Sequence, residues 1–172
     1  RGGRMARSVG GQGRLDEGPG LVEYPVVASG SFSDEFLKLP EEVLTTTMIH
    51  HQHFFPITND QGKLQPVFLA VLNMEPDQKD IVSRNMERVL TARLRDAQFF
   101  YQSDRQQSLS DHQRRLDTVL FHKKIGTYLQ KSERVAQRAA DIAAKVLHAP
   151  QLAEAAREAG QLCKADLATD MV

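Results

Sequence analysis

The chain has 172 residues, with 22 Lys and Arg against 22 Asp and Glu, so its formal net charge is zero. This balance excludes a histone-like polycation, and 41% hydrophobic with 26% charged residues is typical of a globular protein. The single cysteine, Cys163, excludes an intrachain disulfide and indicates a reducing compartment. No run of 18 apolar residues and no signal peptide occur, so we expect a cytoplasmic protein with no membrane partner.

The first 73 residues predict a leader followed by a mixed unit of strands and helix. Seven glycines in residues 1–20 predict a flexible leader. We expect a strand within residues 21–32, a helix that begins at Pro40, and a β-hairpin with strands over residues 53–58 and 64–72.

From residue 79 onward the apolar period changes to about 3.6, which predicts helices to the end of the chain. We expect the second of these helices to open at Ser110 with Gln113 in a capping box, and the third to begin at Ser132 and stop before Pro150. The apolar side of the third helix comprises Val135, Ala139, Ile142, Ala143 and Val146. A fourth helix should run from Pro150, and the chain then ends without a helix stop signal.

These elements predict an α+β fold, in which a mixed unit with a β-hairpin precedes a helical region. We divide the chain into a leader (1–20), a body domain (21–131) and the start of a helical domain (132–172). Because the chain begins with Arg1 rather than Met, we expect it to be an internal fragment of a larger polypeptide.

The neutral total hides a basic middle, since residues 79–145 hold 14 basic and 8 acidic side chains. Such a field favours a polyanion partner, and arginines one helical turn apart can each bind a phosphate. A solvated helix face and a protein interface are the alternatives. The candidate phosphate contacts are Arg84, Arg88, Arg93, Arg95, Lys123, Lys124, Lys131 and Arg134.

The usual catalytic signatures are missing, so we assign no catalytic residue. The chain has no phosphate-binding GxxxxGK[ST] loop, no GxGxxG and no GxSxG. The HHQH segment at residues 50–53 has poor spacing for one ion, so we assign no metal site. Asp111 and His112 lie at a predicted helix start, which favours capping. We expect Cys163 to be a buried thiol and the aromatic residues 99–101 to belong to the core.

Several long strings resemble one family in both order and spacing over about residues 21–172. The strings LVEYPV, LPEEVLTTTM, HHQHFFPI, GKLQPVFLAVLN, ERVLTARLRDAQFFYQSD, LDTVLFHKKIGTYLQKSERV and LCKADLATDMV resemble the β subunit of bacterial glycyl-tRNA synthetases of the α2β2 type. The segment from Arg93 to Asp104 and the Gly126-Thr127 turn carry most of this likeness, and the leader matches poorly.

The resemblance implies an enzyme whose α subunit activates glycine with ATP and Mg, while the β subunit recognises tRNA(Gly). The implied partners are the α subunit, tRNA(Gly) and a second β subunit, and the region from Ser132 would begin a helical domain similar to His-Asp (HD) phosphohydrolases. This implies tRNA binding and assembly without covalent chemistry in this segment. The alternatives are a purely structural intersubunit module and a metal-dependent hydrolase that uses Asp166, although the chain has no His-Asp dipeptide.

Overall fold

A computed structural model describes residues 7–8 and 22–171 of the chain. It has the predicted mixture of helices and antiparallel sheets. The chain separates into two compact units, Arg1–Phe99 (unit 1) and Phe100–Val172 (unit 2), each of which is described by itself. Among the described residues, no helix is both long enough and apolar enough to cross a membrane.

Unit 1 is built on a four-stranded antiparallel sheet with the strand order β1-β3-β4-β2. The strands are β1 (Arg7–Ser8), β2 (Val26–Ser31), β3 (Phe55–Thr58) and β4 (Leu64–Leu72). Strands β3 and β4 confirm the predicted hairpin. The predicted flexible leader lies outside the described residues except for Arg7 and Ser8, which pair with β3.

The turn of this hairpin is held by Asn59. Its side-chain oxygen accepts hydrogen bonds from the backbone N–H groups of Gln61 and Lys63 at 3.0 and 2.9 Å. Gly62 has a φ of +78°, which suits a residue without Cβ. Local turn chemistry therefore fixes the pairing of Thr58 with Leu64 next to the turn, and the register shifts between Thr58 and Pro56.

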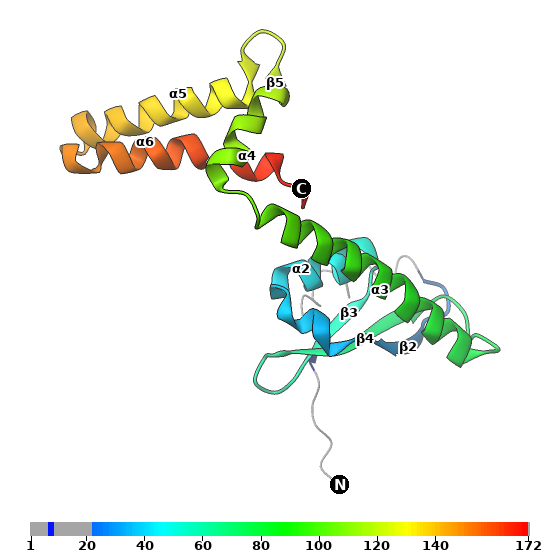
Figure 1. Cartoon of the computed structure of the whole chain (residues 1–172). Coiled ribbons are helices and arrows are strands. Elements are labelled where there is room, and N and C mark those ends of the chain that lie inside the picture. Colours follow the sequence, from blue (N-terminus) through cyan, green and yellow to red (C-terminus); the bar gives the residue numbers. More distant parts are fainter. Residues whose placement is uncertain (1–6, 9–21, 172) are drawn as a thin grey trace. The chain divides into compact units, whose positions relative to one another are not determined.

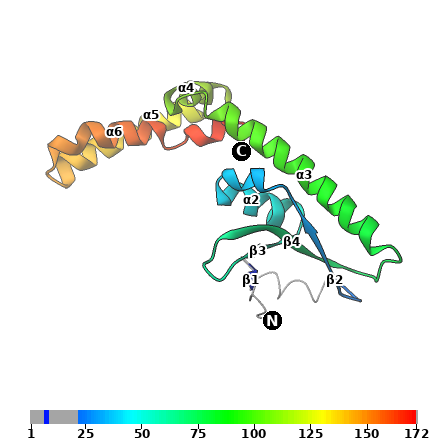
Figure 2. The ribbon, with the colours of Figure 1, turned by 60° about the horizontal axis from the view of Figure 1, so that its bottom comes forward.

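Helices cover one side of the sheet in unit 1 (Figure 2). They are η2 (Asp34–Lys38), α2 (Glu41–Thr46), the π-helical η3 (Thr47–His51) and α3 (Lys79–Asp104) up to Phe99. Helix α2 begins directly after Pro40, as predicted, with Glu41 and Glu42 at the positive end of its dipole. The side chains at the centre of this core are at most 1% exposed, namely Phe36, Leu44, Met48, Phe68, Leu90 and Leu94.

Unit 2 is a helical hairpin with a small two-stranded sheet at one end (Figure 1). After the last turns of α3 its elements are α4 (Leu109–Arg115), η4 (Leu116–Thr118), β5 (Leu120–His122), β6 (Gly126–Thr127), α5 (Tyr128–Asp141), the π-helical η5 (Ile142–Val146), η6 (Pro150–Leu152), α6 (Ala153–Leu162) and η7 (Ala165–Ala168). The Asp104 carboxylate accepts backbone hydrogen bonds from Asp170 and Met171 at 2.8 and 3.1 Å, which ties the chain after η7 to the end of α3.

Helices α5 and α6 pack closely because the residues between them are small. A Cβ atom on Gly160 would lie 2.6 Å from the Cα atom of Ala136, so only glycine permits this approach. The residues of α5 and η5 that are buried are Ser132, Ala136, Ala140 and Ala143.

The larger residues on the apolar side of the third helix are not buried. Val135, Ile142 and Val146 are 37%, 49% and 66% exposed, whereas Ala143 is buried. Contact with α6 selects the alanine side of the helix because the close approach leaves no room for branched side chains.

Two predicted helix starts are also wrong. Helix α4 is capped by Ser108 rather than Ser110, since the Ser108 hydroxyl accepts from the Asp111 N–H while the Asp111 carboxylate accepts from the Ser108 N–H. Helix α5 begins at Tyr128 rather than Ser132, because Thr127 and Gln130 form the same reciprocal pair.

The hairpin of β5 and β6 lies where the sequence pattern predicted only helix. Gly126 has a φ of +94°, outside the helical range, and the Ile125 N–H closes the turn onto the His122 carbonyl at 3.1 Å. Leu120 is 58% exposed in β5. The second helix therefore ends at Arg115.

Candidate nucleic-acid interface

Three of the predicted arginines share one exposed side of helix α3. At 100° per residue, Arg84, Arg88 and Arg95 lie within about 40° of one another around the helix, and all three are exposed. Their Cα atoms span about 16 Å along the axis at 1.5 Å per residue. We call these three residues the arginine row.

Arg93 lies on a different side of α3. It is exposed as well, but its position is about 180° from Arg84 around the helix, so one ligand on the arginine row cannot reach it in the same way. The buried Leu90 and Leu94 point between the two, toward the core of unit 1.

The arginine row is not neutralised by nearby carboxylates. Glu87, which precedes Arg88 in α3, accepts hydrogen bonds from the N–H and hydroxyl of Ser31 at 2.8 and 2.9 Å. Arg84 donates from Nε to the Asp80 carbonyl at 3.1 Å. Within the described part of the chain, no salt bridge involves the arginine row or Arg93. The row therefore presents uncompensated positive charge.

The other four predicted contacts belong to unit 2. Lys123 and Lys124 are exposed at the turn between β5 and β6. Lys131 is half-buried, with its Nζ atom 3.6 Å from the centre of the Phe121 ring, a cation–π contact. Arg134 donates to the Ile125 carbonyl at 3.1 Å. Lys131 and Arg134 are thus partly engaged within the unit, whereas Lys123 and Lys124 face solvent.

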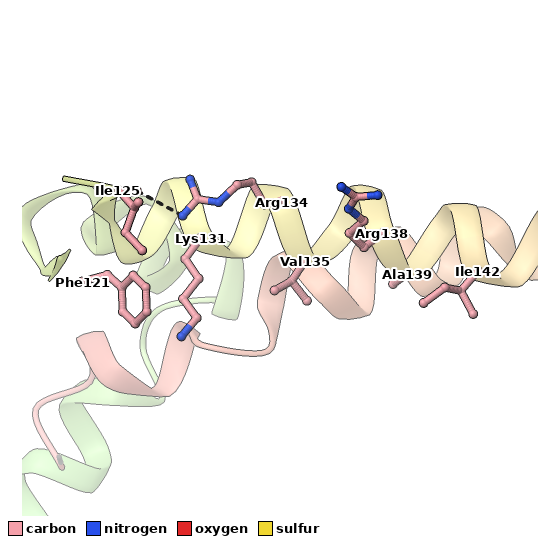
Figure 3. Close-up of a pocket in the computed structure, with 8 residues that line it drawn as sticks. All are labelled: Phe121, Ile125, Lys131, Arg134, Val135, Arg138, Ala139 and Ile142. Carbon is pink, nitrogen blue, oxygen red and sulfur yellow. Dashed lines mark hydrogen bonds between the residues drawn. The ribbon is translucent and has the colours of Figure 1, made fainter.

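Lys131 and Arg134 also line an open groove of about 480 Å³ along α5 (Figure 3). Its floor is apolar, and its eight lining residues carry three positive charges and no carboxylate. They are Phe121, Ile125, Lys131, Arg134, Val135, Arg138, Ala139 and Ile142. Sequence reasoning missed Arg138, although its spacing of one helical turn from Arg134 signals a shared edge.

The residues considered for other chemistry lie apart. His50, His51 and His53 are all exposed, and the described residues contain no cluster of three His, Cys, Asp or Glu able to hold a metal. Asp111 has the predicted capping role. A hydrogen bond from Ser108 holds the pKa of Asp111 below its ordinary value. Asp166 is exposed within η7.

Two expectations of burial are wrong. Cys163 is exposed rather than buried, because it follows the last turn of α6. Its S–H group donates to the Gly160 carbonyl, with Sγ and O 3.1 Å apart. Phe99 and Phe100 are 66% and 40% exposed, since the buried side of α3 runs through Leu90 and Leu94, whereas Tyr101 is half-buried.

Comparison with known sequences decides the family. The family model described as "Glycyl-tRNA synthetase beta subunit" matches residues 7–172. The chain belongs to the glycyl-tRNA synthetase β-subunit family. This match begins at residue 7. The expectation that the leader matches the family poorly is therefore wrong for residues 7–20.

Three similar relatives are each named "Glycine--tRNA ligase beta subunit". The protein of Magnetococcus marinus is 44% identical over 173 residues, covering 98% of this chain and 24% of that protein. The protein of Coxiella burnetii is 45% identical over 94% of this chain and 23% of its own length, and that of Synechocystis is 43% identical over 92% and 22%. The chain thus spans about a quarter of the length of these curated relatives.

Proposed function

We propose that this chain is part of the β subunit of a cytoplasmic glycine–tRNA ligase. In this proposal it supports glycyl-tRNA(Gly) synthesis by binding tRNA(Gly) and by assembling with the catalytic α subunit, which binds ATP and Mg. The family supports the first part, because it is named for one subunit of an aminoacyl-tRNA synthetase. The chain itself holds no catalytic residue in this proposal.

The arginine row is the observation that supports tRNA contact. Three guanidinium groups on one side of a helix, with no salt bridge to any described residue, match a phosphate backbone in charge and in donor geometry. Contacts of this kind position RNA without reading its sequence, and their strength falls with salt. Arg93 is excluded from this footprint because it faces away. Lys123 and Lys124 are the members of unit 2 best placed for a second phosphate contact.

Glycylation kinetics of the full-length β subunit assembled with α test this proposal. We expect Arg88→Gln with Arg95→Gln to raise the KM for tRNA about tenfold, because two charged hydrogen-bond donors are lost. The KM values for glycine and ATP should not change. Arg93→Gln is the matched control on the same helix, and it should change the KM for tRNA less than twofold. An equal effect of both variants would contradict the role of the arginine row.

A second candidate makes the arginine row an intersubunit surface, with carboxylates of the α subunit or of a second β subunit as partners. The same unpaired charge supports it, since arginine is enriched at interfaces. Sedimentation of the mixed subunits separates the two roles. Weaker assembly of the double variant at unchanged tRNA affinity would favour the interface.

A further inference from the structure

The carboxylate of Glu87 joins helix α3 to one edge of the sheet in unit 1. Its Oε1 atom accepts from the N–H and from the hydroxyl of Ser31 at 2.8 and 2.9 Å. Ser31 is the last residue of β2, and β2 is an edge strand of the four-stranded sheet. The two elements lie next to each other in both views (Figures 1 and 2). These two hydrogen bonds therefore hold α3 against β2.

The bond to the Ser31 N–H satisfies a group that the sheet leaves free. In an edge strand, every second N–H points away from the neighbouring strand. The Phe32 N–H bonds to the Pro66 carbonyl of β4 at 3.1 Å, so the Ser31 N–H points outward. Gly30 permits the close approach of α3, because a Cβ atom there would lie only 3.1 Å from the Cγ atom of Glu87. The sequence of β2 is thus suited to hold Glu87 in this place.

Glu87 shares one side of α3 with two buried leucines. At 100° per residue, Glu87, Leu90 and Leu94 lie within about 60° of one another around the helix, and both leucines are fully buried. The arginine row is centred about 110° farther around the same helix. The side that holds α3 on unit 1 therefore also decides the direction in which the arginine row points.

The two leucines alone hold this direction less firmly than the hydrogen bonds do. Burial of apolar side chains is non-directional, whereas a hydrogen bond weakens steeply when its angle falls below about 120°. Groups at the surface of a helix lie about 5–6 Å from its axis, so a roll of α3 by about 30° would shift them by about 3 Å. A shift as long as a hydrogen bond would take guanidinium groups away from the phosphates that they contact.

We propose that Glu87 is a positioning residue, which holds α3 at the rotation that turns the arginine row toward the phosphate backbone of tRNA. This inference rests on the proposed function, because Glu87 acts through the arginine row. Glu87 itself does not contact tRNA, since a carboxylate that faced the backbone would repel its phosphates. Its part is to accept the two hydrogen bonds from Ser31.

Glycylation kinetics of the full-length β subunit assembled with α test this inference. Glu87→Met keeps an unbranched side chain of similar size but removes the acceptor, so it should raise the KM for tRNA about fivefold. The KM values for glycine and ATP should not change. Glu87→Gln is the matched control, because its amide oxygen can accept the same two bonds, and it should stay within twofold of the wild type. Hydrogen exchange of β2 peptides should become faster in Glu87→Met and stay unchanged in Glu87→Gln.

A double-mutant cycle shows whether Glu87 acts through the arginine row. In the background of Arg88→Gln with Arg95→Gln, Glu87→Met should change the KM for tRNA less than twofold. An equal rise in both backgrounds would overturn the proposal. An equal effect of Glu87→Met and Glu87→Gln would overturn it as well, because the charge of Glu87 rather than its hydrogen bonds would then matter.

The same cycle separates this inference from the proposed function. A higher KM for tRNA in the arginine double variant, without any rise in Glu87→Met, would remove only the role of Glu87. No rise in the arginine double variant would contradict the proposed function and this inference with it. Ser31→Ala, which removes only the hydroxyl donor, replaces Glu87→Met if that variant does not fold. It should raise the KM for tRNA about two- to threefold, and an unchanged KM would overturn the proposal.

Discussion

The two units build their hydrophobic cores from different kinds of residue. Unit 1 buries large side chains between one sheet and its helices, with Phe36 and Phe68 fully buried. Unit 2 buries mostly alanine, with Ala136 and Ala140 between two helices that meet at Gly160. The difference shows that apolar composition alone does not decide which side of a helix becomes the core.

The choice of core residues decides which side chains stay exposed on the surface of each unit. In unit 2 the larger aliphatic residues of α5 remain outside, because the close helix contact admits only small ones. In unit 1 the exposed side of α3 carries charge instead, in the arginine row. One unit therefore offers a charged helix surface and the other an apolar one.

The largest expected effect is in the core of unit 1. Phe68 is fully buried and stacks on Phe54 with ring centres 4.5 Å apart. Phe68→Ala should lower the free energy of unfolding of unit 1 by about 3–5 kcal/mol, measured by hydrogen exchange of β4 peptides. The neighbouring Val67 is 38% exposed, so Val67→Ala should cost less than about 1 kcal/mol. Equal losses would contradict the assigned core.

In unit 2, the substitution Gly160→Ala tests whether the close approach of α5 and α6 requires glycine. In an ordinary helix this substitution stabilises by up to about 1 kcal/mol. Here the new Cβ would meet the Ala136 backbone, and we expect a loss of about 1–3 kcal/mol, seen as faster hydrogen exchange in α5. Ala159→Ser, at an exposed position on the same helix, is the control. Stabilisation by Gly160→Ala would show that the two helices do not approach closely.

A smaller loss is expected at the start of α5. The Thr127 hydroxyl accepts from the Gln130 N–H at 3.3 Å and caps the helix. Thr127→Ala should destabilise unit 2 by about 1 kcal/mol in urea unfolding, whereas Thr127→Ser should retain the cap. If both variants unfold together, α5 does not depend on this cap.

The smallest effect concerns pH. The hydrogen bond from Ser108 lowers the pKa of Asp111 in the folded protein, so its contribution is present above the ordinary aspartate value of 3.8 and is lost as the pH falls through the lower folded value. Asp111→Asn should therefore reduce the urea midpoint of unit 2 at pH 6. The difference from the wild type should shrink by pH 3. A difference that does not depend on pH would contradict this role of the carboxylate.

Local signals predicted the parts of the fold that depend on neighbours in sequence. The hairpin of β3 and β4 and the start of α2 at Pro40 follow from turn residues and from the missing proline donor. The cap of α4 was not predicted correctly, because Ser108 with Asp111 and Ser110 with Gln113 both fit the spacing of a capping box. A carboxylate is the stronger acceptor, and it decides between them.

The type of the candidate site and the grouping of its arginines on α3 were both predictable from the sequence. Counting charge located the basic region, and helical geometry alone places the arginine row together. The position of Arg93 follows from the same geometry. The exposure of Val135 and Ile142 does not follow from helical geometry, because it depends on Gly160 in another helix. A periodic pattern along one helix cannot reveal that contact. The β5–β6 hairpin likewise depends on the positive φ of Gly126.

The salt dependence of tRNA binding tests the central claim most directly. Anisotropy of labelled tRNA(Gly) would be measured with the full-length β subunit, alone and with α, at several salt concentrations. If the arginine row contacts phosphates, Arg88→Gln with Arg95→Gln should flatten the slope of log K against log salt by about 0.7–0.9 for each lost contact, and Arg93→Gln should not change it. An unchanged slope in the double variant would show that α3 does not bind the tRNA backbone.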